Sequence, residues 1–127
     1  MSQQSIRTPM GKVRGLGSAK EGANHFIAQR VTAVALVVLV PVVLFFLIKA
    51  TQGGYATALA FVANPFFAIV LLLTCGAAFY HMRLGLQVLV EDYIHKPVTK
   101  ALLLSANTLI AAGLWVAALY AVLAIAS

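Results

Sequence analysis

The residues of this sequence that could do chemistry are concentrated between His81 and Tyr93. His81 stands inside a long apolar run, and the run ends in two acids and a phenol, Glu91-Asp92-Tyr93. Ionisable side chains are expensive at membrane depth, so such a residue is a candidate functional group by default. His81 is therefore considered first as a ligand.

Helical geometry assigns these candidates to different faces. Eleven residues at about 100° each return to nearly the same direction, which places His81 and Asp92 on one face, roughly 16 Å apart along the axis. Gly85, one turn beyond His81, shares that face and would let something flat or bulky approach the backbone beside the imidazole. Arg83 points about 200° away from His81 and therefore belongs to a different surface.

The composition of the chain is that of an integral membrane protein. Of its 127 residues, 62% are hydrophobic and 9% are charged, which is outside the usual composition of soluble domains. A helix needs about 20 apolar residues to cross a hydrocarbon core of about 30 Å. Continuous runs of that length cover roughly residues 26–48, 66–90 and 98–124. We therefore expect an all-α membrane protein with three transmembrane helices.

The basic residues indicate how the chain crosses the membrane. Most of them precede or open the first run, two lie between the second and third runs, and Lys49 borders the first connection. By the positive-inside rule, the N-terminus and the second connection face the cytoplasm. We predict a multi-pass protein of a bacterial-type inner (plasma) membrane, with its C-terminus on the opposite side. Because topology explains the net charge of +6, nucleic-acid binding is not expected.

Residues 1–25 are interpreted as a basic cytoplasmic segment. Up to Asn24 the chain is polar and contains four glycines that break any helical pattern, so we expect it to be extended or irregular. Such a long polar stretch before the apolar run does not fit a secretory signal, and no cleavage is predicted. Cys75 is the single cysteine, which excludes a disulfide framework and a paired-cysteine metal site.

Prolines and glycines predict where the helices bend and end. Pro41 lies inside the first run and should kink it. Gly53-Gly54 and Asn64-Pro65 are turn signals, so residues 51–65 are expected to form a short connection. Pro97 suits the first turn of the third helix.

Small and polar residues in the second and third runs predict helix contacts. Gly76 and the two alanines that follow it would allow close approach of a neighbouring helix. Asn107 and Thr108 are expected to bond a neighbouring helix or a backbone carbonyl.

His81 has two open interpretations. It is either a hydrogen-bonded packing residue or an axial ligand of a haem, for which histidine is a standard choice. His25 and His95 give no second ligand close by in the sequence, so a second axial ligand would come mainly from another polypeptide. No catalytic triad, phosphate loop or paired carboxylates appear, and catalysis by this chain alone is not expected.

Charged residues near the ends of the runs also have alternative roles. Arg30 could snorkel to lipid head groups, or it could meet an anionic cofactor group such as a haem propionate. Acids at a helix C-terminus are locally unfavourable, so the Glu91-Asp92 pair should be held by Lys96 or Lys100, or by an arginine of a partner. Tyr93 is either an aromatic-belt residue or a hydrogen-bond donor to a quinone carbonyl.

Two short patterns point to a known family. One is His81, three residues, Gly85, six residues and Asp92-Tyr93; the other is His25-Phe26, three residues, Arg30 and then Thr32-Ala33. With the three spans, they resemble the D-type hydrophobic membrane anchor subunits of succinate dehydrogenase (succinate:quinone oxidoreductase, respiratory complex II). The match covers about residues 20–125.

The resemblance implies a role for each matching residue. His81 would be an axial ligand of the iron of haem b, with the other histidine given by a C-type cytochrome b anchor subunit. Arg30 would lie near the haem propionates, and Gly85 would leave clearance for the haem. Tyr93 would hydrogen-bond ubiquinone, while Asp92 would organise the charged groups around that site.

The resemblance also implies a complex. The bundle would be completed by the C-type anchor, and the two would tether a flavoprotein subunit with FAD and an iron–sulfur subunit to the membrane. Electrons from succinate would then pass to ubiquinone, which links the tricarboxylic acid cycle to the respiratory chain. The chain would be a subunit of the oxidoreductase without a catalytic domain of its own.

Rival functions remain open on the residues alone. A fumarate reductase anchor would look similar, and a purely structural anchor would use His81 only for packing. A transporter subunit could use His81 and Asp92 as a proton relay, but the first and third runs supply almost no further titratable groups.

Overall fold

The chain is built around three long helices in the computed structural model, which describes residues 8–10 and 20–126. α2 covers Lys20–Ala63, α3 covers Pro65–Tyr93 and α4 covers Pro97–Ala126. Each is long and apolar enough to cross a membrane, and the described residues contain no strand. The predicted fold class, an all-α membrane protein with three transmembrane helices, is confirmed.

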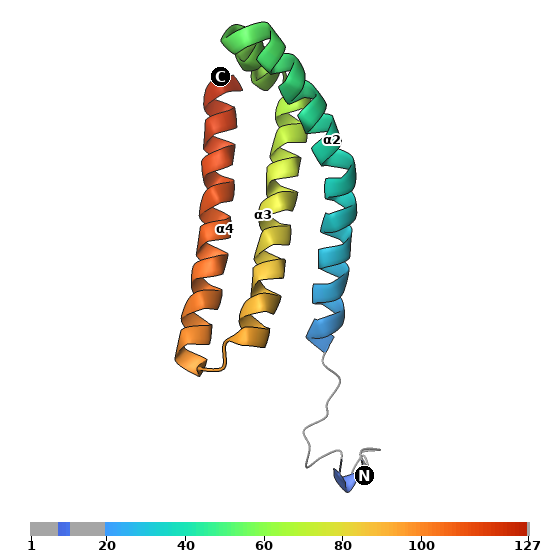
Figure 1. Ribbon diagram of the computed structural model, residues 1–127, viewed down its shortest axis with the longest axis vertical. Coiled ribbons are helices and arrows are strands. Elements are labelled where there is room, and N and C mark those ends of the chain that lie inside the picture. The colour runs from blue at the N-terminus through green and yellow to red at the C-terminus, as the bar shows by residue number, and fades with distance from the viewer. Residues whose placement is uncertain (1–7, 11–19, 127) are drawn as a thin grey trace, which may run out of the picture.

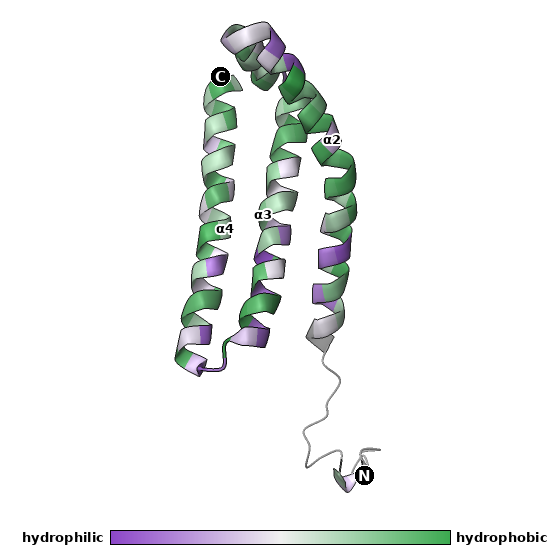
Figure 2. Cartoon of the chain, viewed as in Figure 1, coloured by the Kyte–Doolittle hydropathy of each residue, from purple (hydrophilic) through white to green (hydrophobic). Residues whose placement is uncertain are grey.

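α3 is the middle helix of the bundle. It packs against α2 on one side and α4 on the other (Figure 1). We call the end where α3 finishes at Tyr93 and α4 begins at Pro97 the polar end, because most of the hydrophilic residues of the three helices gather toward it (Figure 2). α2 begins at the polar end and α4 finishes at the opposite end (Figure 1).

α2 continues much farther than the sequence predicts. The connection expected over residues 51–65 is helical as far as Ala63, and Gly54 alone has non-helical angles, with φ 75° and ψ −173°. The Thr57 hydroxyl donates to the carbonyl of Gly53 at 2.8 Å, which supports the first turn after the break. The two turn signals lie where the chain breaks, at Gly54 and at Asn64, but the connection between them is helical. A positive φ is open mainly to glycine, so Gly54 alone is enough to redirect the helix.

The part of α2 after the break, residues 55–63, is here called the crossing limb because it lies across the end of the bundle (Figure 1). Phe61 of this limb contacts Phe46 of α2 and Phe67 of α3, with ring centroids 5.6 and 6.0 Å apart. Phe67 is only 3% exposed. Aromatic pairs at these distances contribute about 0.5–1.5 kcal/mol beyond their buried area, so the three rings hold the limb against α3.

The start of α2 also differs from expectation. Residues 20–24 are helical, so the prediction of irregular structure was wrong there, while residues 1–7 and 11–19 lie outside the described part. Helix propagation adds a hydrogen bond per residue, which outweighs the cost of about 1 kcal/mol for Gly22. Pro41 lies within α2, and non-helical angles occur in α2 at Gly54.

The two short joints follow their sequence signals. The Asn64 side-chain oxygen accepts from the N–H groups of Phe66 and Phe67 at 3.0 and 3.3 Å, and Pro65 is the first residue of α3. This is an N-cap followed by a proline that needs no donor. Pro97 opens α4, as predicted.

α3 and α4 are joined by a close approach and by polar contacts. A Cβ placed on Gly76 would clash with the indole of Trp115, so the predicted close approach is confirmed at this glycine. Asn107 donates from Nδ2 to the carbonyl of Arg83 at 2.9 Å, and Thr108 donates to the carbonyl of Leu104 at 3.0 Å. The predicted bonding of Asn107 and Thr108 is therefore confirmed.

We expect Gly76→Ala to weaken the packing of α3 on α4, because the new methyl group would displace the Trp115 indole. Overpacking of this kind costs about 1–3 kcal/mol. The thermal midpoint of the purified chain in detergent, followed by the fluorescence of its single tryptophan, measures the loss. Gly113→Ala is the matched control, since nothing lies within 4 Å of a Cβ at Gly113. Equal losses in both variants would contradict the contact.

Candidate functional site

His81 lies where α3 packs against the beginning of α2. Its Nδ1 is 2.9 Å from the hydroxyl oxygen of Thr32, and the imidazole is half-buried. The same hydroxyl lies 2.8 Å from the carbonyl oxygen of Ala28 and 3.0 Å from that of Gln29. Carbonyls only accept, so if the hydroxyl gives its single proton to the backbone of α2, its oxygen is left to accept from Nδ1 of His81.

In that arrangement of hydrogen bonds, the proton of His81 lies on Nδ1. With the proton on Nδ1, the neutral ring keeps a lone pair on Nε2. Metal-binding histidines are oriented in this way, with the other ring N–H donated to a fixed acceptor. The Nε2 of His81 is therefore prepared to bind a metal ion or to accept a hydrogen bond.

A small polar cavity of about 190 Å³ adjoins the imidazole and is lined by His81 with Gln29, Arg30 and Ala33 of α2. The guanidinium carbon of Arg30 lies 5.1 Å from the ring centre of Phe26, a cation–π contact that supports it from the preceding turn. Pockets that enclose a drug-sized ligand measure about 300–1,000 Å³. The cavity is therefore too small to enclose such a ligand. It could hold one side of a larger molecule, placed between the Arg30 guanidinium and Nε2 of His81.

Gly85 provides free space on α3, one turn from His81 toward the polar end. Nothing lies within 4 Å of the position that a Cβ would take on this residue. A bulky group beside the imidazole needs such space. The face of α3 at Gly85 is open in this chain.

Asp92 and Tyr93 lie apart from His81, in the last turn of α3. Both are exposed, and Tyr93 is 76% exposed. At 1.5 Å per residue, they are roughly 16 and 18 Å from His81 along the helix. The structure thus brings Arg30 to His81 but leaves the Asp92–Tyr93 pair as a separate group at the polar end.

The acidic end of α3 is held through Glu91. Gln87 donates from Nε2 to the Glu91 carboxylate at 2.8 Å, and Lys100 donates from Nζ to the Glu91 backbone carbonyl at 2.9 Å. A cation near the last carbonyls of a helix is stabilising. Lys96 or Lys100 was expected to hold the acidic side chains, but Lys100 bonds the Glu91 backbone carbonyl and the Glu91 carboxylate accepts from Gln87 instead.

Sequence reasoning missed Gln29 and gave Thr32 no role beyond a family pattern. One available sign was that a half-buried imidazole needs a partner, and these two polar residues are three apart and so share one face of α2. Which of them meets His81 depends on the register of α2 against α3. That register is visible only in the structure.

Arg83 was predicted to belong to a different surface from His81, and the structure confirms this. Its Nε donates to the hydroxyl of Thr108 on α4 at 3.1 Å, whereas His81 bonds to Thr32 on α2.

A family model matches almost the whole chain. Residues 4–124 correspond to the family described as succinate dehydrogenase/fumarate reductase transmembrane subunit. The chain belongs to this family. The family that the two short patterns resembled is thereby confirmed, and the three spans agree with a multi-pass membrane protein.

Curated relatives of this anchor family cover most of the chain. The succinate dehydrogenase hydrophobic membrane anchor subunit of Rickettsia bellii is 34% identical over 89 residues, which is 70% of this chain and 71% of the relative. The subunit of the same description from Paracoccus denitrificans is 34% identical over 94 residues, or 74% of this chain and 73% of the relative. No solved structure matches the chain.

Proposed function

We propose that the chain is the hydrophobic membrane anchor subunit of a succinate dehydrogenase, where it holds one side of haem b and forms part of a ubiquinone site. Family membership and the two relatives support the anchoring role. The single observation behind the haem proposal is the hydrogen bond from His81 to Thr32, because it leaves Nε2 available beside the cavity at Arg30.

The residues around His81 fit a haem. Its Nε2 would be one axial ligand, and the Arg30 guanidinium would neutralise a propionate at the cavity. Gly85 leaves room for the ring beside the backbone. When bound, haem supplies one-electron redox chemistry. Because this chain offers one histidine there, the second ligand would come from a C-type cytochrome b anchor subunit.

Thr32 would position the ligand. Its oxygen receives the Nδ1 proton while its own proton is held by the backbone of α2, so rotation of the imidazole would break a hydrogen bond in an apolar environment. Such partners also raise the basicity of a metal-binding histidine.

The polar end would hold the ubiquinone site. The Tyr93 hydroxyl would donate to a quinone carbonyl, and Asp92 would hold neighbouring charged groups in place. Both side chains are exposed in this chain, which leaves them free to be covered by partner subunits. With the polar end facing the cytoplasm, as the basic residues predict, the iron–sulfur subunit and the FAD-bearing flavoprotein would dock there.

The direction of the reaction is proposed from the relatives. The family description includes both succinate dehydrogenase and fumarate reductase, whereas the two relatives above are described as succinate dehydrogenase anchors. We therefore favour oxidation of succinate with reduction of ubiquinone.

Replacing His81 with alanine tests the ligand directly. We expect the purified His81→Ala complex to lose its b-type signal in the reduced-minus-oxidised spectrum, because no other group of the cavity has a suitable nitrogen lone pair. His95→Ala, in the exposed connection between α3 and α4, should keep the signal. An unchanged spectrum in His81→Ala would make this residue a packing residue of a structural anchor.

Thr32→Val keeps the shape of the side chain but removes the acceptor for His81. We expect the complex to bind haem about 10–100-fold more weakly, as when other outer partners of metal ligands are lost, and to show a shifted midpoint potential. Thr51→Val is the control, since the Thr51 hydroxyl bonds only the nearby Ile48 carbonyl, at 2.8 Å. If Thr32→Val keeps the wild-type haem affinity and midpoint potential, Thr32 does not position His81.

Tyr93→Phe removes the proposed donor to the quinone. We expect the KM for ubiquinone to rise about two- to tenfold, which corresponds to one hydrogen bond of about 0.5–1.5 kcal/mol, with the haem spectrum unchanged. Tyr120→Phe, a similarly exposed tyrosine of α4 at 75%, should leave the KM as it is. The hydrogen bond is contradicted by full quinone affinity in the Tyr93 variant.

A further inference from the structure

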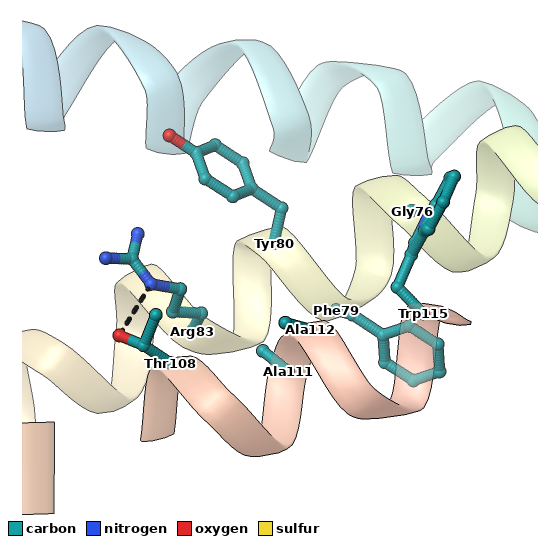
Figure 3. A pocket seen from close by; sticks show the side chains of 8 residues that line it. All are labelled: Gly76, Phe79, Tyr80, Arg83, Thr108, Ala111, Ala112 and Trp115. Carbon is teal, nitrogen blue, oxygen red and sulfur yellow. Dashed lines mark hydrogen bonds between the residues drawn. The ribbon is translucent and has the colours of Figure 1, made fainter. Parts of the chain in front are cut away.

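A second cavity lies between α3 and α4. This groove of about 390 Å³ is lined mainly by Gly76, Tyr80 and Arg83 of α3 and by Thr108, Ala112 and Trp115 of α4. Figure 3 shows Arg83 and Thr108 together at one end of the groove and Gly76 with Trp115 at the other. Seven residues separate Arg83 from Gly76, so the groove runs roughly 10 Å along the bundle.

Arg83 brings a permanent charge to this groove. The side chain stays protonated under all ordinary conditions, and Thr108 takes just one of its five N–H donors, at 3.1 Å. The backbone of Arg83 is also fixed, since its carbonyl accepts from Asn107. The guanidinium is therefore held at the groove with donors to spare.

Within the part of the chain that the structure describes, no acidic side chain lies on α3 or α4 beside this cation. The chain has three acidic residues in all; Glu91 and Asp92 are eight and nine residues farther along α3, at least about 12 Å away along the axis. The third is Glu21, near the start of α2. A cation inside a membrane span needs a partner, so its counter-charge has to come from another molecule.

The two ends of the groove differ in polarity, and this difference indicates the chemical class of that molecule. The charged end lies nearer the polar end of the bundle, and Figure 3 shows the Arg83 side chain extending in that direction, away from Trp115. From there the groove continues toward the middle of the membrane between apolar walls, including Ala112 and the 37% exposed Trp115. An amphiphile with an anionic head at Arg83 and a hydrocarbon tail toward Trp115 matches this polarity.

The direction of the groove favours a lipid over a partner helix. Tyr80 and Arg83 are about 100° and 200° from His81 around α3, so the groove faces away from the surface that a second haem ligand would approach. That step rests on the proposed function. Basic pockets between membrane helices are known to bind anionic lipid head groups. We propose that the groove at Arg83 binds an anionic phospholipid of the leaflet at the polar end, with its phosphate on the guanidinium.

The experiment compares lipid binding by purified complexes that contain all subunits. After delipidation in detergent, native mass spectrometry follows the binding of added phosphatidylglycerol, with phosphatidylcholine as the lipid control. Wild type should prefer phosphatidylglycerol, and Arg83→Gln should bind it at least roughly tenfold more weakly, since a charge-assisted bond is lost. Lys49→Gln, which removes a cation of α2 near the Phe45 ring, should bind as wild type does.

A second variant leaves the charge in place. Ala112→Phe fills the apolar part of the groove while Arg83 and Thr108 remain, and it should also weaken phosphatidylglycerol binding. The proposal is overturned if both variants bind this lipid like wild type, or if phosphatidylcholine binds wild type equally well. A raised KM for quinone in Arg83→Gln with unchanged lipid binding would assign the groove to quinone. Loss of a subunit with unchanged lipid binding would assign it to a protein partner.

The outcome is independent of the haem proposal. Arg83 does not contact His81, so the b-type spectrum of Arg83→Gln should equal that of wild type. Loss of phosphatidylglycerol binding with an intact haem signal would support lipid binding in the groove, whatever the result for His81→Ala.

Discussion

The hydrogen bond between Thr32 and His81 fixes how α2 and α3 meet, and the candidate site depends on it. Apolar helix faces in a membrane tolerate small slides against each other, whereas a polar pair in a medium of low dielectric constant is costly to separate. Holding this pair at 2.9 Å places Gln29 and Arg30 level with the imidazole. The register of the two helices and the position of the cation at the cavity therefore both depend on one contact.

α3 carries two polar groups that are satisfied in different ways. His81 faces α2 and is met within the chain by a hydroxyl at Nδ1. Arg83 is charged and faces α4, where Thr108 accepts only one of the hydrogen bonds that the guanidinium can donate. The first arrangement prepares a ligand, whereas the second leaves a charge that only a second molecule can neutralise. One helix thus carries two polar groups that contact different neighbours, His81 toward α2 and Arg83 toward α4.

The sequence predicted those parts of the fold that depend on local chemistry. The three apolar runs, the turn at Asn64-Pro65 and the helix start at Pro97 were all found in this way. The length of α2 was not, because Gly53-Gly54 is a turn signal in isolation, while the contacts of Phe61 with Phe46 and Phe67 join residues far apart in sequence. In the site, His81 and Arg30 were found because charge is costly in a membrane, whereas Thr32 required the helix register.

The crossing limb determines how the protein sits along the membrane normal. α3 and α4, with 29 and 30 residues, are each roughly 45 Å long at 1.5 Å per residue, close to the 40–45 Å of a bilayer with its head groups. A bundle whose length matches the bilayer could still shift along the membrane normal. The limb lies across its end, and Tyr55 at the limb's start is 80% exposed, so inward movement would drag interfacial groups into hydrocarbon. By redirecting the helix, Gly54 would thereby help to hold the imidazole at a constant depth.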